Sequence, residues 1–380
     1  MTAMTANMNF SGLLINTYGV SLKNFVFQTR ILCFSDSCPK STKYRRIAKG
    51  TVIFTLKKFV INKNDGGQRV DKFLSKAVPN MPQSYMYRQI RKKRIKLNGG
   101  RCAISDRLSE NDILELYIND EFFDVSSDDA FDFLFASAKL DIVFEDENIL
   151  LADKKPGLLS HGACGSDTDK TQSSDTLINR IKRYLYEKGE YHPDTENSFA
   201  PALCNRIDRN TGGIVIAAKN AESLRILNDK IKLREVEKRY LCVTAGIPPK
   251  KSDIITAYIE KDRSKNTVTI SDKKTPRNKT AVTEYSVLRD NGRLALVEVN
   301  LLTGRTHQIR AHMAHIGCPL LGDGKYGDSR INREHKMKSQ ALYSYKLKFD
   351  FKTSGGILEY LKGREFTAEK IWFSDMIKFE

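Results

Sequence analysis

One short segment of the chain has residue types that suit chemistry better than packing. Asp208 lies between Arg206 and Arg209 in the segment 205–213, whose last two residues are glycines that open a very apolar stretch. Flanking guanidinium groups favour an ionised carboxylate, and the glycines permit unusual backbone dihedrals or close approach to a ligand. Such a carboxylate can act as a nucleophile, a base or a metal ligand. By itself, the pattern is equally compatible with a structural ion-pair loop.

Three imidazoles further along the chain could suggest a different site. His307, His312 and His315 fall within nine residues, a spacing that resembles that of zinc ligands. No carboxylate or cysteine completes a convincing ligand set, so hydrogen-bonding roles are the better interpretation. Cys204 could be a nucleophile, but a buried cysteine is usually a small apolar filler. We therefore expect neither a metal site nor a reactive thiol.

The segment around Asp208 also carries a family resemblance. NRIDRNTGGIVIAAK, residues 205–219, is similar to the signature H-R-L-D-x-x-T-S-G of the RluA family of pseudouridine synthases, which continues with three hydrophobic residues and x-A-K. Four more blocks resemble family motifs in the right order, namely KKPGLLSHG, EVEKRYLCVTAG, LLTGRTHQIRAHMAHIGCPLLGDGKYG and QALYSYKLKF. The five blocks span about residues 140–350. The chain departs from the motifs at Asn205, Gly212 and Tyr343, where the commoner residues are His, Ser and other types.

The resemblance implies the reaction and its central residues. In such enzymes a uridine is isomerised to pseudouridine, and Asp208 takes the position of the aspartate that acts as nucleophile or base. Tyr240 takes the position of a tyrosine that stacks on the uracil and approaches C5. Arg310 takes the position of the arginine that pairs with the aspartate. Attack on the ribose, attack on the base and a glycal route all stay open, and the family uses no metal or organic cofactor.

Several basic residues near these motifs are candidates for binding the RNA substrate. Arg305 belongs to the same loop as Arg310, and Lys325 follows the Gly-Asp pair of the long motif together with Tyr326. We expect substrate or RNA contacts from cationic and imidazole side chains of the catalytic domain, namely Arg206, Arg209, Arg305, His307 and Lys325.

The bulk composition agrees with an anionic partner. The 380-residue chain has a formal charge of +17, from 63 Lys and Arg against 46 Asp and Glu. Such an excess attracts polyanions over long range, but charge alone does not separate RNA from DNA, an acidic membrane surface or a merely solvated face. No segment approaches the length of apolar sequence that spans a bilayer. The seven cysteines are scattered without a C-x-x-C pair, which fits a reducing cytoplasm.

The front of the chain has two distinct parts. Residues 1–50 carry one acidic residue, Asp36, and resemble a transit peptide, although a poorly ordered extension or a start assigned too far upstream explains them as well. Beyond a possible strand at Val52 to Phe59, the apolar spacing from Gln68 predicts a short helix that Pro79 ends. Ser84 is a candidate N-cap for a second, strongly basic helix.

A small sheet completes this front part. Asn98-Gly99 has hairpin-turn chemistry, and Leu114, Leu116 and Ile118 alternate as a closing strand does. The order of elements over residues 51–118 resembles the S4-like RNA-binding domain. A rigid helix with several cations can contact successive phosphates, and the candidate contacts are its basic residues Arg88, Arg91, Lys92 and Arg94.

The rest of the chain is predicted to be an acidic linker, residues 119–138, and a catalytic domain, residues 139–380. Helices are expected over residues 174–188 and after an Asn220 cap, between strand-like stretches that show no regular alternation with helices. The fold class is therefore α+β, with a mixed, largely antiparallel sheet in the catalytic domain and a small α+β S4-like domain in front. The resemblance makes this the pseudouridine synthase fold.

We expect the chain to act on structured RNA in the cytoplasm, as a monomer. Large-subunit ribosomal RNA is the first candidate substrate, because a front S4-like domain is commonest among family members that act there, and transfer RNA is the alternative. A non-catalytic protein that binds RNA or assists ribosome assembly is the rival from another class. A hydrolase that uses the three histidines to bind a metal is a distant third.

Overall fold

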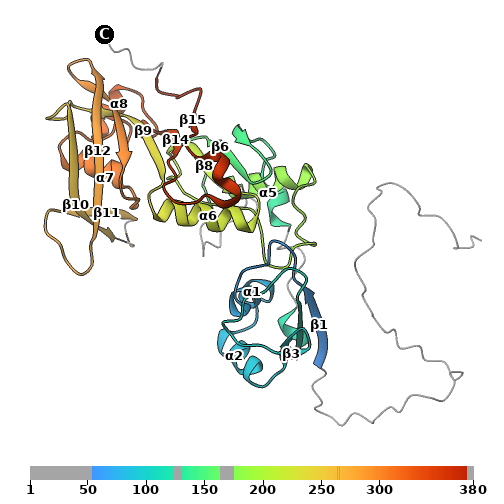
Figure 1. The fold of residues 1–380 in the computed structure, drawn as a ribbon. Helices are drawn as coiled ribbons and strands as arrows, with labels where there is room; N and C mark the ends of the chain where they lie inside the picture. The colour runs from blue at the N-terminus through green and yellow to red at the C-terminus, as the bar shows by residue number, and fades with distance from the viewer. Residues whose placement is uncertain (1–53, 124–130, 163–174, 263, 265, 375–380) are drawn as a thin grey trace, which may run out of the picture. The chain divides into compact units, whose positions relative to one another are not determined.

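The computed structural model describes residues 54–123, 131–162, 175–262, 264 and 266–374 (Figure 1). The predictions for residues 1–50 and for the centre of the acidic linker lie outside the described residues. Within the described residues, no helix is both long and apolar enough to cross a membrane.

The front module has four strands and two helices. Its sheet has the order β1-β4-β2-β3, formed by β1 (Phe54–Val60), β4 (Ile113–Asn119), β2 (Ile95–Leu97) and β3 (Gly100–Arg101). Helices α1 (Val70–Ala77) and α2 (Gln83–Arg91) bury Phe73, Leu74 and Met86 in a core shared with Leu114 and Leu116. All these strand and helix predictions are confirmed, and so is the Asn98-Gly99 turn, whose residues have φ values of 51° and 75°.

The predicted N-cap of α2 is wrong. The helix begins at Gln83, so Ser84 lies inside its first turn, and Pro82 occupies the N-cap position without a side-chain cap. Proline fixes φ near the helical value, and Pro82 has φ −59°, so the chain enters the helix two residues earlier than a cap at Ser84 would require. The basic residues Arg88, Arg91 and Lys92 are exposed, whereas Arg94 is half-buried.

The part of the chain predicted to be the catalytic domain, and so named below, is built on one large sheet. Its main path is β11-β10-β12-β13-β9-β14-β8-β6-β5, with β15 paired to β14 and β7 to β8. The strands are β5 (Ile142–Glu145), β6 (Ile149–Lys154), β7 (Ala202–Leu203), β8 (Gly212–Ala218), β9 (Val236–Ala245), β10 (Ser252–Asp262), β11 (Thr267–Ser271), β12 (Lys279–Asp290), β13 (Leu294–Leu301), β14 (Leu342–Phe349) and β15 (Glu365–Thr367). Only the β14–β8 pair is parallel among these described strands. The predicted mixed, largely antiparallel sheet is confirmed.

Helices cover this sheet at several points. They are α5 (Leu177–Glu187), α6 (Ala221–Lys232), α7 (Gln308–His315) and α8 (Ser329–Glu334), with short 3-10 turns η2 (Asp132–Phe135) and η3 (Gly356–Leu361). A further 3-10 turn, η1 (Asp120–Phe122), follows β4 and packs Phe122 against the core of the front module. Asn220 caps α6 as predicted, since its Oδ1 accepts from the Ser223 amide at 2.8 Å. Helix α5 is capped by Thr176 and starts at Leu177, slightly later than expected.

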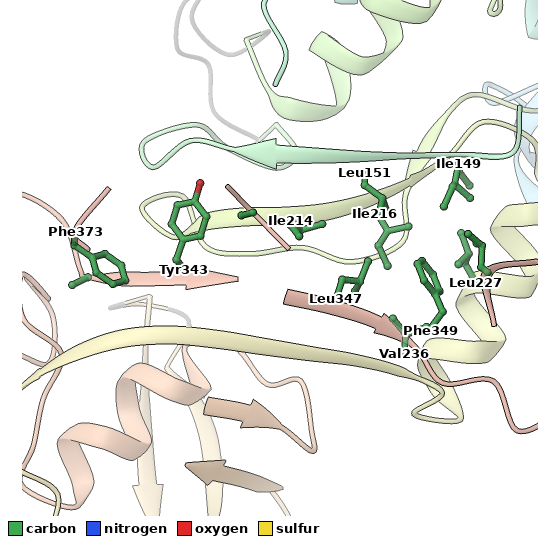
Figure 2. Packing of buried hydrophobic residues seen from close by; sticks show 14 of the residues in the cluster. Ile149, Leu151, Ile214, Ile216, Leu227, Val236, Tyr343, Leu347, Phe349 and Phe373 are labelled. Carbon is green, nitrogen blue, oxygen red and sulfur yellow. The ribbon is translucent and has the colours of Figure 1, made fainter. Parts of the chain in front are cut away.

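The main core lies between α6 and the strands that carry the site. Ile149 and Leu151 of β6, Ile216 of β8 and Phe349 of β14 are fully buried with Leu227 of α6 (Figure 2). Burial of large apolar side chains of this kind is the chief stabilising contribution to a fold. The rigid strand β8 begins at Gly212, directly after the Asp208 segment, so the core fixes one end of that segment.

Part of the predicted linker packs against the catalytic domain. Phe133 in η2 is 2% exposed, and its ring contacts Tyr186 at 5.6 Å and Tyr191 at 5.9 Å between centroids. Phe131 contacts the same Tyr186 ring. The linker therefore ends in an aromatic anchor on α5, and the boundaries of the two domains stay a prediction.

Candidate active site

A single large cleft collects the predicted residues of the catalytic domain. Its volume is about 1080 Å³, and its lining comes mainly from the segments 159–162, 203–211 and 304–310, with Lys238 and Tyr240 from strand β9. The lining includes every site residue predicted in this domain, namely Arg206, Asp208, Arg209, Tyr240, Arg305, His307, Arg310 and Lys325. Residues separated by more than one hundred positions in the sequence thus meet in one site.

Arg310 holds Asp208 from one side. Its Nη1 donates to Asp208 Oδ2 at 3.0 Å, while its Nε and Nη2 donate to the two oxygens of Asp323 at 2.7 and 2.9 Å. Burial opposes the charge of Arg310, but its bonds to Asp323 and Asp208 outweigh this and raise its pKa. The guanidinium is therefore a fixed bridge between two carboxylates.

The two carboxylates differ in how many of their oxygens already accept hydrogen bonds. Asp323 is fully buried, and its Oδ1 also accepts from the amides of Lys325 and Tyr326 at 2.8 and 3.1 Å. Asp208 is 28% exposed at its side chain, and its Oδ1 accepts no hydrogen bond from any described residue. Asp323 is thus a support for Arg310, and Asp208 keeps one oxygen free toward the cleft.

Asp323 was missed as a functional residue in the sequence. The available signal was its place between two glycines in LLGDGKYG, followed by Lys325 and Tyr326. In sequence, an acidic residue in such a turn is typical of a cap or a solvated loop residue. Only the fold shows that α7 brings the Arg310 guanidinium against it.

His307 stands next to the carboxylate in an unusual backbone conformation. It has φ 52° and forms the N-cap of α7, and such left-handed residues outside glycine often mark functional sites. Its Nδ1 lies 3.0 Å from the Tyr326 hydroxyl, whereas its Nε2 is 3.8 Å from Asp208 Oδ2, too far for a hydrogen bond. Burial, with Arg310 and Lys325, lowers the pKa of His307 despite the opposing effect of Asp208.

The three histidines have different neighbours and do not form a common site. His312 is buried and bonds Thr283 through Nδ1 at 2.8 Å, and His315 faces Asp272 at 3.1 Å. Across the described ranges, no group of three or more His, Cys, Asp or Glu side chains could hold a metal ion. Each imidazole has a separate neighbour, and the buried Nε2 of His312 has no hydrogen-bond partner among the described residues.

Tyr240 contributes its ring to the same cleft from the centre of β9. It pairs with Val299 on one neighbouring strand and Ser344 on the other, and it is 5% exposed. Burial raises the pKa of Tyr240 to about 12. The phenol is therefore protonated at neutral pH, where it can stack or donate but is a weak base.

The loop that carries Asp208 is held by a buried ammonium. Lys154 Nζ donates to the carbonyls of Lys155, Leu158 and Arg209 at 3.1, 2.8 and 2.9 Å. Burial lowers the pKa of Lys154 to about 7, against the opposing effect of Asp208. The Arg209 side chain in turn donates through Nε to the Gly157 carbonyl at 3.0 Å. These bonds tie the 205–211 loop to the 154–158 loop.

The two departures from the family signature have different consequences. Asn205 Oδ1 accepts from the Ile216 amide at 2.8 Å, so the asparagine pins the loop to β8. At Gly212, a Cβ atom would lie 2.4 Å from the Tyr343 ring. The hydroxyl of that tyrosine donates to Asp153 Oδ1 at 2.6 Å. Gly212 and Tyr343 are therefore matched to each other.

The cations of the cleft outnumber its acids. Asp208 is the single acidic residue among the described lining residues, which include eight Lys or Arg side chains, namely Arg206, Arg209, Lys238, Lys261, Arg305, Arg310, Lys325 and Lys338. Arg305 Nε and Lys325 Nζ also donate to the backbone carbonyls of Thr280 and Asn266 at 3.0 and 2.6 Å. Such a lining suits a polyanion.

Comparison with known proteins agrees with this geometry. The family model described as RNA pseudouridylate synthase matches residues 148–315. An RNA pseudouridine synthase of Mycoplasma genitalium is 32% identical over 77% of this chain and 88% of its own length. The ribosomal large subunit pseudouridine synthase C of Rickettsia felis is also 32% identical, over 69% of this chain and 83% of its own length. A solved structure of human RNA pseudouridylate synthase domain containing 1 aligns with a TM-score of 0.48 and 22% identity, over 64% of this chain and 88% of that one.

The matched residues include both loops that meet at Asp208 and the strand that carries Tyr240, and the similarity to these relatives extends over most of their length. The chain belongs to the RNA pseudouridylate synthase family and is a pseudouridine synthase of the RluA type.

Proposed function

We propose that this enzyme converts specific uridines of large-subunit ribosomal RNA to pseudouridine, with Asp208 as the catalytic carboxylate. The observation that carries the role of Asp208 is its environment: one oxygen is held by Arg310, the other is free, and basic residues line the cleft around it. The ribosomal substrate is supported by the relatives named for the ribosomal large subunit. Transfer RNA is the alternative substrate.

The chemistry needs a fixed carboxylate beside the target nucleotide. Pseudouridine formation breaks the bond between N1 and C1′, turns the uracil, joins C5 to C1′, removes the proton from C5 and leaves a proton on N1. Asp208 is the acidic group of the described cleft lining with an unoccupied oxygen, so it serves as nucleophile or base. Arg310 positions it, and the protonated Tyr240 packs its ring on the displaced uracil.

The target uridine has to leave its stack to reach a carboxylate inside a cleft. Binding energy for this step comes from phosphate contacts, which in our proposal involve Arg206, Arg209, Arg305 and Lys325, with His307 close to the base. The front module adds the exposed cations Arg88, Arg91 and Lys92 of α2 together with Arg94, in the manner of an S4-like RNA-binding domain. We place the reaction in the cytoplasm, by a monomer that needs no metal or organic cofactor.

The rival proposal is a protein that binds RNA without modifying it. A site that no longer catalyses a reaction is expected to lose first the strained or buried polar residues that lower the stability of the fold. Here the Arg310 bridge, its buried Asp323 support and the left-handed His307 are all present. Strained or desolvated polar residues of this kind persist where function requires them, so the catalytic proposal is favoured.

The test is a pseudouridine map of total RNA from cells that lack the protein and are complemented with one variant at a time. We expect specific ribosomal sites to disappear and to return with the wild-type chain but not with Asp208→Asn. Asp229→Asn on the exposed side of α6 is the matched control, because it makes the same chemical change outside the cleft. Restoration of every site by Asp208→Asn would support the RNA-binding rival, and sites confined to transfer RNA would select the alternative substrate.

A further inference from the structure

Three basic side chains come from elements that hydrogen bonds join to one another beside the cleft. Two of them, His161 and Arg206, line the cleft, and Lys182 lies on α5. The loop before His161 is fixed on both sides: the Ser160 carbonyl accepts from the Ile178 amide of α5 at 3.2 Å, and Ser160 Oγ donates to the Ile207 carbonyl at 3.0 Å. Hydrogen bonds therefore hold this loop between the helix and the segment that carries Asp208.

None of the three has a carboxylate partner among the described residues. The contrast with the rest of α5 is sharp, because its other cations are all paired. These pairs are Arg180 with Asp175 at 2.7 Å and Arg183 with Glu187 at 2.7 Å. Lys188, the C-cap residue of the helix, pairs with Glu145 at 2.9 Å. The side chains of His161, Lys182 and Arg206 make no ion pair or hydrogen bond within the described part of the chain.

This arrangement works against the stability of the fold. Burial lowers the pKa of Lys182. Burial also lowers the pKa of His161, and the charges of Arg206 and Lys182 lower it further. Like charges without a counter-ion disfavour each other's ionised forms, so a bound anion would relieve the repulsion. Features that cost stability in a cleft are a signature of binding rather than packing.

We propose that His161, Lys182 and Arg206 form a binding site for an RNA phosphate adjacent to the nucleotide that reaches Asp208. The proposal rests on RNA being the substrate and adds the contacts of His161 and Lys182. The cleft volume of about 1080 Å³ exceeds the roughly 300–1,000 Å³ of an ordinary small-molecule pocket, so it has room for nucleotides that flank the target. Each linkage of such a strand brings one negative charge.

The first measurement is the salt dependence of binding to a fluorescent oligouridylate of ~12 nucleotides, with full-length wild type and Lys182→Gln. Loss of one phosphate contact reduces the slope of log affinity against log salt by about 0.7 for a single strand. From roughly 50 to 200 mM salt, the wild type should therefore lose about 2.6-fold more affinity than the variant. At low salt the variant should bind about tenfold more weakly, as for loss of a hydrogen bond to a charged group.

Stability separates binding from a structural role. Because no described residue forms an ion pair or hydrogen bond with the Lys182 side chain, we expect the melting temperature of Lys182→Gln to equal or exceed that of the wild type. We expect Lys182→Arg to keep the wild-type salt slope. Lys232→Gln, an exposed lysine of α6 outside the cleft lining, is the matched control with unchanged slope. His161→Gln provides a second variant and should weaken binding at low salt while leaving the melting temperature unchanged.

Two results would overturn the proposal. One is a wild-type slope and affinity in both Lys182→Gln and His161→Gln. The other is that inorganic phosphate, added at constant ionic strength, raises the melting temperature of the wild type but not of Lys182→Gln, while the two proteins bind RNA with equal affinity. The site would then bind free anions and not an RNA phosphate. Neither result depends on turnover, so failure here is distinct from failure of Asp208→Asn to abolish pseudouridine formation.

Discussion

Replacing Gly212 with serine restores the commoner residue of the family signature, yet we expect this change to destabilise the chain. A Cβ at position 212 would lie 2.4 and 2.7 Å from two carbons of the Tyr343 ring and 3.2 Å from Pro156 Cδ. Carbon atoms pack best at about 3.5–4.0 Å, so the ring would have to move by about 1 Å. Tyr343 is 1% exposed and bonded to Asp153, which leaves it little freedom to move.

The size of the effect follows from two opposing contributions. Overpacking of a tight core costs about 1–3 kcal/mol, whereas replacing glycine removes freedom from the unfolded chain and returns about 0.4–1 kcal/mol. We therefore expect Gly212→Ser to lower the free energy of unfolding by about 1–2 kcal/mol. Gly324→Ser is the control for the unfolded-state contribution, because nothing lies within 4 Å of its added Cβ.

A double-mutant cycle in denaturant tests the reasoning. Tyr343→Leu removes the ring edge that the serine would strike, so the second change should cost less in the Tyr343→Leu background than in the wild type. We expect a coupling energy of about 1 kcal/mol or more, within the range for residues in contact. Equal costs in both backgrounds, or a Gly212→Ser chain as stable as Gly324→Ser, would refute the match between Gly212 and Tyr343.

Three further outcomes follow from the site. Arg310→Lys keeps the charge but loses the planar fork that reaches Asp208 and Asp323 together, so single-turnover rates should fall by about 10²–10³ with a smaller change in substrate affinity; an equal rate would show that the bridge is dispensable. Burial raises the pKa of Tyr240 to about 12, so wild type and Tyr240→Phe should have parallel rate profiles between about pH 8 and 10, and an alkaline decline in the wild type alone would contradict this. Burial lowers the pKa of Lys238, which lines the cleft. Burying this charge therefore lowers the free energy of unfolding at neutral pH, and the loss is relieved as pH rises toward the pKa of lysine in the unfolded chain. Lys238→Met should keep or raise stability at pH 7 in thermal melts, while weakening RNA binding about tenfold in titrations.

The sequence predicted best where local patterns decide the structure. The Gly pair before an apolar run predicted β8, and Asn220 was correctly assigned as a cap, because a side-chain cap depends only on a few neighbouring residues. The cap at Ser84 failed for a related reason: Pro82 starts the turn earlier by fixing its own backbone.

The sequence was uninformative where the fold buries polar residues. Helix α7 has buried side chains at Gln308, Ile309, Arg310, Ala311, His312 and Met313. A helix buried on nearly all sides shows no apolar stripe, so periodicity did not reveal it. Strands β10 and β11 were also not identified from the sequence. Asp323 escaped notice because its role depends entirely on a helix that approaches it from another part of the chain.

The charge balance of the site explains why its arrangement can serve both catalysis and RNA binding. Arg310 is shared by the buried Asp323 and the partly exposed Asp208, so one guanidinium bridges two carboxyl groups in a basic cleft. Truncating Asp323 would release the Arg310 guanidinium and let it turn toward RNA phosphates, because a buried cation that loses its partner is left with an uncompensated charge. The buried Asp323 therefore keeps Arg310 on Asp208, and in our proposal the other cations of the cleft lining are left to bind the RNA strand.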